Sequence, residues 1–294
     1  MESSILLGLI MFAIGMFLVF IIVWLTRDKE EKKENKTSPT IELTPKIDIL
    51  KEEGEFKALL KGFNKQEQLL LPIGITEENN IKTINLNEIS NILVLGTTGG
   101  GKSVLLNELL STVGMYYTKE EVRIVAIDTS LVELGSFNNL PHYVKKSISL
   151  PQDINEELVE LQKLLSSKKD NIPLLVFIDD VYDIYTYDKS NQKIILDLLR
   201  NGKEKNIHLI LTTDTPTKEL LTKELKDNIQ GTLYLTMSPG EDEDLDLENS
   251  LTTEDWEYLT KIGNLIYEEN NHKERIKVPE VLDEEIKSIN NFYL

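Results

Sequence analysis

The stretch from Asn91 to Leu110, NILVLGTTGGGKSVLLNELL, constrains the fold more than any other part of the chain. A short apolar run leads into a glycine-rich turn, and a helical pattern follows. The turn, Gly96 to Ser103, fits the phosphate-loop pattern G-x-x-x-x-G-K-[ST]. Such a loop needs a buried strand before it and a helix after it, and the sequence supplies both. The stretch therefore predicts an α/β domain that binds a nucleotide through its phosphates.

Each residue type in this loop has a physical reason to be there. Glycines allow successive backbone N–H groups to turn inward around phosphate oxygens, where a side chain would collide. The following helix points its positive N-terminal end at the same phosphates. Lys102 is expected to reach the β- and γ-phosphates, and Ser103 to hold Mg²⁺. The predicted nucleotide-binding residues of the loop are Gly96, Thr97, Thr98, Gly99, Gly100, Gly101, Lys102 and Ser103.

Short apolar runs alternate with helical patterns through the rest of the C-terminal part. The runs LLLPIGI and IKTINL flank the turn residues TEENN and predict a hairpin. Further strands are predicted at 91–95, 122–127, 173–178, 207–212 and 231–236, and helices near 102–112, 154–166, 190–204 and 217–227. This order predicts a mostly parallel sheet flanked by helices on both faces. In such sheets ligands bind beyond the carboxyl ends of the strands.

Acidic residues stand where two of these strands end. The run PLLVFIDD finishes with Asp179 and Asp180. A carboxylate at the end of a strand neighbouring the phosphate loop can order Mg²⁺ through water, and the next carboxylate can orient or deprotonate the attacking water. Thr213 and Asp214 end the following strand and are candidates for sensing the γ-phosphate. The alternative for that segment is a plain polar turn, with Thr217 as a helix N-cap.

Residues 5–25 form a run of 21 residues without a charge, long enough to cross a bilayer as a helix. Five basic residues follow at 27–36, whereas only Glu2 is charged before the run, so the C-terminal side is expected in the cytoplasm. A cleaved signal peptide is the alternative, but no basic residue precedes the run and no small-residue cleavage site follows it. We predict a single-pass cell-membrane protein with a transmembrane helix at 1–26, a charged tether with a short amphipathic helix near Ile47–Leu60 at 27–64, and a cytoplasmic domain at 65–294.

Composition narrows the ligands and partners. The chain has no cysteine and three histidines far apart in sequence, which excludes disulfide frameworks and thiolate metal sites. Mg²⁺ carried in with phosphates remains compatible, since it prefers oxygen ligands. The formal net charge is −18. Such a surface repels polyanions unless its lysines are concentrated in one place.

Taken together, these motifs resemble those of the FtsK/SpoIIIE family of motor ATPases. Besides the phosphate loop, the similar blocks are VRIVAIDTSLVELGSFNNLPHYV, PLLVFIDDVYDIY, NIHLILTTDTPT and the tail GNLIYEENNHKERIKVPEVLDEEIKSI, so the resemblance covers about 65–290. It implies a RecA-like P-loop fold, a hexameric ring with ATP sites between subunits, and double-stranded DNA in the central channel. It also implies that the loop binds ATP and Mg²⁺, that Asp179 supports Mg²⁺, and that Asp180 occupies the position of the catalytic glutamate.

The chain departs from the family pattern at places that affect hydrolysis. Asp180 is one carbon shorter than glutamate, and the family's Thr-Gln-Arg-Pro turn reads TDTP over 213–216, with the loss of an amide and a guanidinium. The segment GEDEDLDLE (240–248), interpreted as a solvated acidic loop, replaces the family's Asp-Ser-Arg region. Arg200 or Lys203 is a candidate for acting on the γ-phosphate bound by a neighbouring subunit. The alternative is that both are solvated charges on a surface helix.

The function predicted first is a membrane-anchored ATPase that moves DNA, by analogy the coupling ATPase of a conjugation system. Two alternatives stay open: a motor that moves protein together with secretion components, and a nucleotide-binding membrane scaffold with weak or no hydrolysis. A DNA channel would be lined by one of two lysine-rich sets, Lys193, Arg200, Lys203 and Lys205 or Lys218, Lys223 and Lys226.

Overall fold

The computed structural model describes residues 46–50, 54–65, 68–129, 134–237 and 251–294. The chain divides into two units, Met1–Thr44 and Pro45–Leu294, and only the second is described below. The predicted membrane span at 5–25 lies outside the described residues. Within the ranges given above, no helix combines the length and the apolar character needed to cross a bilayer.

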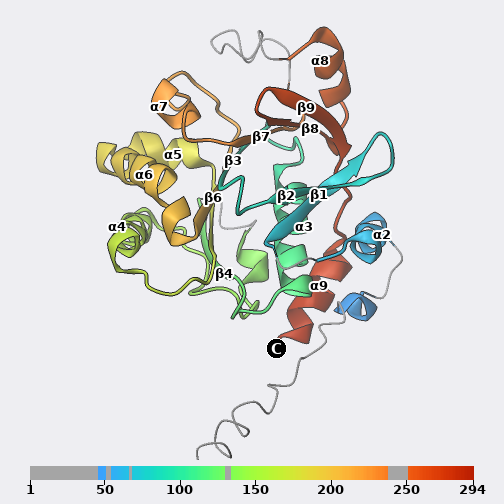
Figure 1. Cartoon of the computed structure of the whole chain (residues 1–294), viewed down its shortest axis with the longest axis horizontal. Coiled ribbons are helices and arrows are strands. Elements are labelled where there is room, and N and C mark those ends of the chain that lie inside the picture. Colours follow the sequence, from blue (N-terminus) through green and yellow to red (C-terminus); the bar gives the residue numbers. More distant parts are fainter. Residues whose placement is uncertain (1–45, 51–53, 66–67, 130–133, 238–250) are drawn as a thin grey trace, which may run out of the picture. The chain divides into compact units, whose positions relative to one another are not determined.

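One mixed sheet runs through the second unit, and among the described residues its strand order is β2-β1-β9-β8-β7-β3-β6-β5-β4 (Figure 1). The strands are β1 (Leu70–Thr76), β2 (Ile81–Asn85), β3 (Asn91–Leu95), β4 (Arg123–Asp128), β5 (Leu174–Asp179), β6 (Ile207–Thr213), β7 (Gly231–Tyr234), β8 (Asn264–Glu269) and β9 (His272–Lys277). The neighbours from β7 to β4 pair in parallel, and those from β2 to β7 pair antiparallel. The predicted mostly parallel sheet is therefore correct only for the half that carries the phosphate loop, because the two hairpins extend the same sheet.

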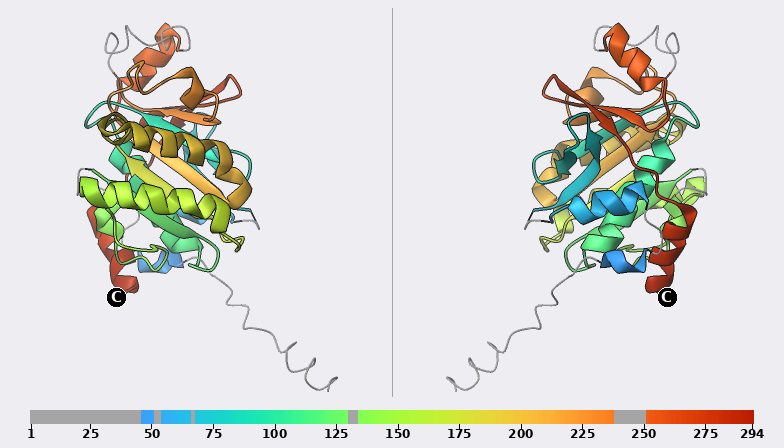
Figure 2. Two further views of the ribbon diagram at one scale, coloured as in Figure 1. Left: turned by 90° about the vertical axis from the view of Figure 1, so that its left-hand side faces the viewer. Right: turned by 90° about the vertical axis from the view of Figure 1, so that its right-hand side faces the viewer.

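Helices cover both faces of the sheet. They are α2 (Glu55–Gly62), α3 (Lys102–Tyr116), α4 (Pro151–Ser167), α5 (Val181–Tyr187), α6 (Lys189–Asn201), α7 (Lys223–Lys226), α8 (Thr253–Leu259) and α9 (Asp283–Phe292), with 3-10 turns η1 (Lys46–Ile49), η2 (Leu134–Phe137) and η3 (Lys203–Lys205). Figure 2 shows α4 and α6 on one face and α2, α3 and α9 on the other. Alternate residues of β3 enter the two cores, Ile92 and Val94 on the α3 side and Leu93 and Leu95 on the α6 side. Burial on both faces explains why the strand reads as a continuous apolar run.

The part of the predicted tether from Pro45 to residue 64 belongs to the same compact unit as the ATP-binding fold, because that unit starts at Pro45. Phe56, Leu59 and Leu60 of α2 are buried in the core, and the Tyr116 hydroxyl at the end of α3 donates a hydrogen bond to the Leu60 carbonyl. The expected amphipathic helix near Ile47–Leu60 is present as two pieces, η1 and α2. α2 therefore packs against the phosphate-loop helix α3, although it precedes residue 65, at which the domain predicted from the sequence begins.

The predicted helix at 217–227 is wrong for most of its length. The only helix there is the short α7, which is capped by Thr222, whose hydroxyl accepts from the Leu225 N–H at 3.2 Å. Thr217 caps no helix; its hydroxyl accepts at 3.4 Å from the Leu220 N–H within a turn. Side-chain and turn hydrogen bonds of this kind offer the backbone an alternative to the helix, which is why the polar segment after β6 stays irregular.

Two buried polar residues stand out on the elements around the phosphate loop. The Asn91 amide at the start of β3 donates to the Leu199 carbonyl of α6 at 2.7 Å and to the Asn228 carbonyl at 2.9 Å. Glu108 in α3 is fully buried, and neither of its carboxylate oxygens has a hydrogen-bond partner among the described residues. Burial raises the pKa of Glu108 well above its ordinary value. The first residue fixes the loop strand at its amino end, and the second destabilises the loop helix whenever it ionises.

Candidate functional site

The phosphate loop connects β3 to α3 and is fastened to the chain that follows β7. The N–H and the hydroxyl of Thr97 both donate to the Thr236 carbonyl, at 2.9 and 3.0 Å, and the Thr236 N–H donates to the Gly100 carbonyl at 3.3 Å. Gly99 and Gly101 have φ angles of 76° and 102°, in the left-handed region that favours glycine. Local glycine geometry and contacts to Thr236 together fix the loop. Thr236 was not singled out from the sequence, because no motif marks it.

The loop leaves donors free on the side a phosphate would occupy. Among the described residues, the N–H groups of Thr98, Gly99, Gly101, Lys102 and Ser103 make no intramolecular hydrogen bond. A Cβ on Gly99 would meet open space, since nothing lies within 4 Å. The Lys102 ammonium is folded back and donates to the carbonyls of Gly96 and Thr97 at 2.8 and 3.2 Å. A concave row of unpaired N–H groups with a lysine beside it fits nucleotide phosphates.

Gly100 is the loop position at which a side chain is least tolerated. A Cβ there would lie 2.7 Å from the Thr236 carbonyl oxygen and 2.8 Å from that of Thr97, both backbone atoms. We expect Gly100→Ala to displace the loop and to lower nucleotide affinity about tenfold, the equivalent of one lost charge-assisted hydrogen bond. Fluorescent nucleotide titration measures the affinity. Gly135→Ala, whose Cβ meets its nearest atom only at 3.4 Å, is the matched control; equal affinity of the two variants would contradict the expectation.

Asp179 ends β5 and Asp180 follows it. The sequence pattern predicted that this strand would lie next to the loop strand β3, and that prediction is wrong. β6 pairs with both β3 and β5 and separates them. Thr212 of β6 spans this gap, because its hydroxyl donates to Asp179 Oδ1 at 2.6 Å and accepts from the Asp180 N–H at 3.1 Å. The order of parallel strands depends on tertiary pairing, so the sequence pattern did not point to Thr212 as part of the site.

Asp180 combines unusual backbone geometry with an unusual acidity. Its φ of 51° is left-handed, a conformation that aspartate tolerates better than most residues. Burial raises the pKa of its carboxyl to about 6, with further contributions from the charges of Asp214, Asp183 and Asp179, against which Lys102 acts. The Thr213 hydroxyl donates to Asp180 Oδ1 at 3.4 Å. A carboxylate poised near neutral pH beside a phosphate site is suited to accept a proton from water.

Asp214 lies against the tip of the phosphate loop. Its Oδ2 accepts from the Thr98 hydroxyl at 2.5 Å, and its Oδ1 accepts from the Thr215 hydroxyl at 2.9 Å. The Gly96 N–H also donates to the Thr213 carbonyl at 3.3 Å, so the end of β6 contacts the loop at both Gly96 and Thr98. A cavity of about 450 Å³ opens here, lined by Thr97, Thr98, the turn 214–217 and Met237. The predicted sensor residues are thus brought to the loop.

A metal ion would need the phosphates as partners. No cluster of three acidic or histidine side chains that could hold a cation by itself exists in the described part of the chain. Ser103, the second residue of α3, has a partly exposed side chain, and Asp179 presents a largely buried carboxylate that accepts a hydrogen bond from Thr212. These oxygen donors fit Mg²⁺, which keeps several waters and phosphate oxygens in its shell. The predicted metal residues remain a prediction.

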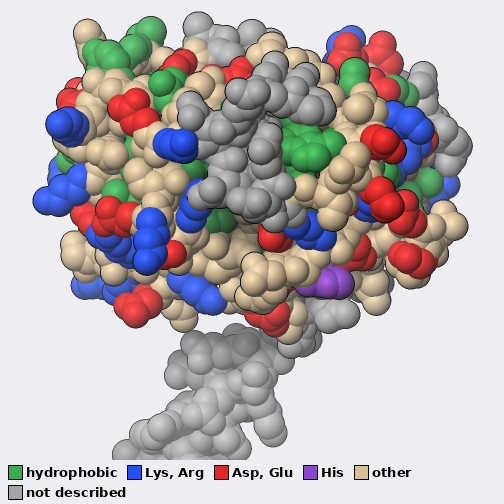
Figure 3. Space-filling view, turned by 90° about the horizontal axis from the view of Figure 1, so that it is seen from above, with side chains coloured by type: hydrophobic (Ala, Val, Ile, Leu, Met, Phe, Trp, Pro, Cys, Tyr) green, Lys and Arg blue, Asp and Glu red, His purple; other side chains and the backbone are tan. Residues whose placement is uncertain are grey.

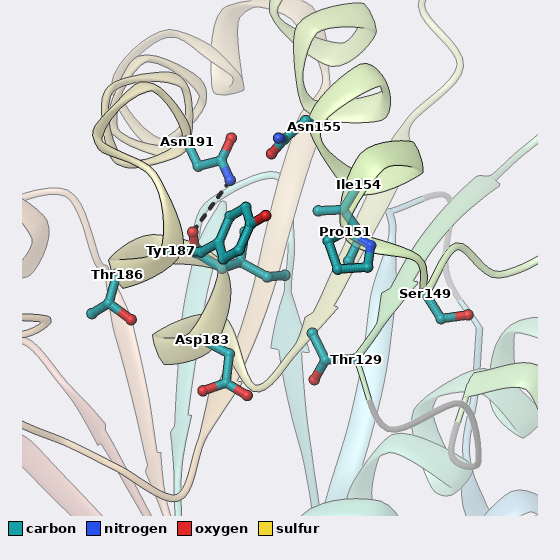
Figure 4. A pocket seen from close by; sticks show the side chains of 10 residues that line it. Thr129, Ser149, Pro151, Ile154, Asn155, Asp183, Thr186, Tyr187 and Asn191 are labelled. Carbon is teal, nitrogen blue, oxygen red and sulfur yellow. Dashed lines mark hydrogen bonds between the residues drawn. The ribbon is translucent and has the colours of Figure 1, made fainter.

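A second cavity, about 470 Å³, lies between the start of α4 and the helices α5 and α6 (Figure 4). Its lining includes Thr129, Asp183 and the exposed ring of Tyr187. The Asn191 amide, also in the lining, donates to the Ile184 carbonyl at 3.3 Å. Because α5 begins directly after Asp180, this cavity adjoins the same edge of the sheet. None of the loop residues Gly96–Ser103 is among the residues that line it.

The residues considered for action on a neighbouring subunit lie elsewhere. Arg200 and Lys203 come just before β6, at the opposite end of that strand from Thr213. Arg200 forms an ion pair with Glu224 of α7, and the Lys203 ammonium donates to the Glu88 carbonyl at 2.9 Å. Both are therefore remote from the loop of their own chain.

Comparison with known proteins agrees with this geometry. The profile of the FtsK/SpoIIIE family matches residues 61–252. Among curated proteins, a DNA translocase FtsK of Streptococcus pyogenes is 25% identical over 262 residues, which is 78% of this chain and 32% of the relative. A DNA translocase FtsK of Leptospira interrogans is 24% identical over 255 residues, 76% of this chain and 26% of the relative. The chain thus spans about a third or less of the length of these relatives.

Solved structures share the fold at low sequence identity. The pCW3 conjugation coupling protein TcpA, with ATPγS, has a TM-score of 0.65 at 16% identity, covering 80% of this chain and 73% of TcpA. The cytoplasmic domain of the type VII secretion ATPase EccC of Thermomonospora curvata has a TM-score of 0.63 at 17% identity, covering 79% of this chain and 32% of EccC. The site described above is thus built on a fold that these ATPases share.

Proposed function

Because the chain belongs to the FtsK/SpoIIIE family of ATPases, we propose that it is a membrane-anchored motor that hydrolyses ATP to move double-stranded DNA. The observation that carries the proposal is the single edge of the sheet where free loop N–H groups, Lys102 and the carboxylates of Asp179 and Asp180 are joined through β6. The motor is proposed to work as a ring of six copies. Residues 5–25 are proposed to anchor it, with the ATPase domain in the cytoplasm.

Each group at this edge has a role in the proposed reaction. ATP with Mg²⁺ supplies the phosphoryl group whose transfer to water releases the free energy. The loop N–H groups and Lys102 bind the phosphates, with Lys102 leaving its loop carbonyls to do so. Ser103 and Asp179 hold the cation, and the Thr212 hydroxyl keeps the Asp179 carboxylate in place. Asp180 orients the attacking water and accepts its proton.

DNA binding requires a basic surface on an acidic chain. Lys193 of α6 and Lys223 and Lys226 of α7 are exposed, and the Arg200–Glu224 ion pair joins α6 to the α7 segment. Because this ion pair brings α6 and α7 together, we treat the two lysine-rich sets proposed from the sequence as one candidate surface. In Figure 3, Lys and Arg side chains gather on the left, the side on which Figure 1 places α6 and α7. A local concentration of lysines of this kind supports phosphate-backbone contacts despite the net charge of −18.

The test is DNA-stimulated hydrolysis by the full chain reconstituted in lipid nanodiscs. We expect duplex DNA to stimulate ATP turnover at low salt and the stimulation to decline between about 50 and 200 mM salt. Joint replacement Lys193→Glu, Lys223→Glu and Lys226→Glu should remove the stimulation and keep the basal rate. The control carries Lys119→Glu and Lys261→Glu, also exposed but away from α6 and α7. Equal stimulation of both variants would exclude the α6–α7 surface.

Two other outcomes would redirect the proposal. Basal hydrolysis without any DNA effect, together with crosslinking of a secreted protein, would favour a protein motor; the fold shared with EccC and the acidic surface are the observations behind that alternative. Nucleotide binding without hydrolysis would favour a membrane scaffold. In that case Asp180→Glu, which restores the family's longer side chain, should recover turnover.

A further inference from the structure

Asp214 occupies a place where a negative charge works against the proposed ligand. Its carboxylate accepts hydrogen bonds from Thr98 of the loop tip at 2.5 Å and from Thr215 at 2.9 Å, and is thereby held over the loop. The same residue lines the cavity in front of Thr97 and Thr98. A carboxylate is therefore fixed directly beside the tip of the phosphate loop.

The carboxylate is ionised at neutral pH. Burial by itself would raise the pKa of Asp214, but hydrogen bonds from Thr98 and Thr215 and the charge of Lys102 outweigh burial, so its pKa is lowered. The charged groups that act on this position are Lys102, which attracts it, and Asp180, whose own pKa the Asp214 charge helps to raise. Lys102 therefore already faces two carboxylates before a phosphate arrives.

Adding a terminal phosphate brings more negative charge into this space. Two like charges about 4 Å apart repel strongly when partly buried, because the effective dielectric constant near a protein surface is far below that of water. A diphosphate ends one phosphate earlier and meets less of this repulsion. A divalent cation on the terminal phosphate cancels the repulsion and can be attracted by the carboxylate.

We propose that Asp214 is the specificity-determining residue of the phosphate site: held on the loop tip by Thr98, its carboxylate rejects a terminal phosphate that lacks its cation and admits the magnesium complex. The proposal rests on the proposed binding of ATP and adds a rule for which form is bound. Asp214 would then select nucleotide by whether its terminal phosphate carries a cation, which goes beyond the γ-phosphate sensing that was predicted from the sequence.

The experiment measures binding, not turnover. The full chain in detergent is titrated with ATPγS and with ADP, each with Mg²⁺ and with EDTA in its place. For the wild type, removing Mg²⁺ should weaken ATPγS at least tenfold more than ADP, and in Asp214→Asn this excess should disappear. Thr98→Val, which frees the carboxylate from the loop, should reduce the excess. Asp183→Asn, which removes a charge from the adjoining cavity, is the matched control and should keep it.

The outcomes separate the two proposals. A wild type that binds neither nucleotide with Mg²⁺ overturns the proposed function itself. A wild type that binds both but shows no excess, or an Asp214→Asn variant that keeps the excess, overturns the filter and leaves ATP binding intact. Loss of the excess in Asp183→Asn as well would assign the effect to overall negative charge and so also overturn the role of Asp214. Thermal denaturation confirms that each variant is folded.

Discussion

Replacing Asp180 by asparagine should lower the rate of ATP hydrolysis by about 10²–10⁴-fold, the usual contribution of a general base. Asparagine has the same shape but cannot accept a proton, and the hydrogen bond from the Thr213 hydroxyl can be made to its amide oxygen. Nucleotide affinity should be retained, since the loop N–H groups and Lys102 are unchanged. Steady-state phosphate release and nucleotide titration measure the two quantities. A variant with near wild-type turnover would remove Asp180 from the reaction.

The pH dependence of the wild-type rate gives an independent check on Asp180. A base works in its ionised form, and the carboxyl has a pKa of about 6. The rate should therefore rise as the pH increases through about 6 and level off above it. Asp183→Asn removes one of the charges that raise this pKa, so it should move the rise to lower pH and leave the plateau unchanged. A rise that stays in place would show that another group limits the rate at acid pH.

The second large effect is expected on stability, at Glu108. This side chain is fully buried in α3 without a hydrogen-bond partner among the described residues. Glu108→Gln nearly keeps the shape and removes the ionisable group, so it should raise the free energy of unfolding at pH 8 by about 1.4 kcal/mol for each unit by which burial raises the pKa of Glu108. Urea denaturation followed by circular dichroism measures the change. Glu156→Gln, on the exposed side of α4, is the control and should change stability little.

The sign of the pH effect distinguishes the cause. Because burial raises the folded pKa of Glu108 above its ordinary value of 4.5, the unfolded chain releases this proton at lower pH than the folded chain. The stability contribution is therefore complete below about pH 4.5 and is lost as the pH rises toward the folded pKa. The difference between Glu108→Gln and the wild type should grow from pH 5 to pH 8. A difference independent of pH would point to packing instead of ionisation.

The parts of the fold that depend on local sequence were predicted best. The strand at Asn91–Leu95, the loop and the helix from Lys102 follow from glycine spacing and apolar periodicity, and the hairpin β1–β2 from its turn residues. The strand order did not follow, because nothing local says that β6 inserts between β3 and β5. The roles of Thr212 and Thr236 depend on that order and could not be predicted. For the same reason, β5 was wrongly predicted to lie next to the loop strand.

Polar segments were the other source of error. The prediction of a helix at 217–227 relied on periodicity, whereas the hydroxyls of Thr217 and Thr222 accept hydrogen bonds from the N–H groups of Leu220 and Leu225, and the helix is confined to α7. That Asp214 directly follows a strand could be predicted from the sequence, but its contact with the phosphate loop could not. Its bond to Thr98 joins residues 116 positions apart and turns a candidate sensor into a charge on the loop.

The Asn91 amide gives the loop strand a mechanical role. β3 carries the phosphate loop at one end, and at the other Asn91 bonds it to carbonyls of α6 and of the segment after α7. These are the elements that hold the exposed lysines Lys193, Lys223 and Lys226. β3 is also hydrogen-bonded along its length to β6 and β7, so these three strands can only move together. In the proposed motor, a displacement of the phosphate loop would therefore reach α6 through the sheet and through the Asn91 hydrogen bond at its far end.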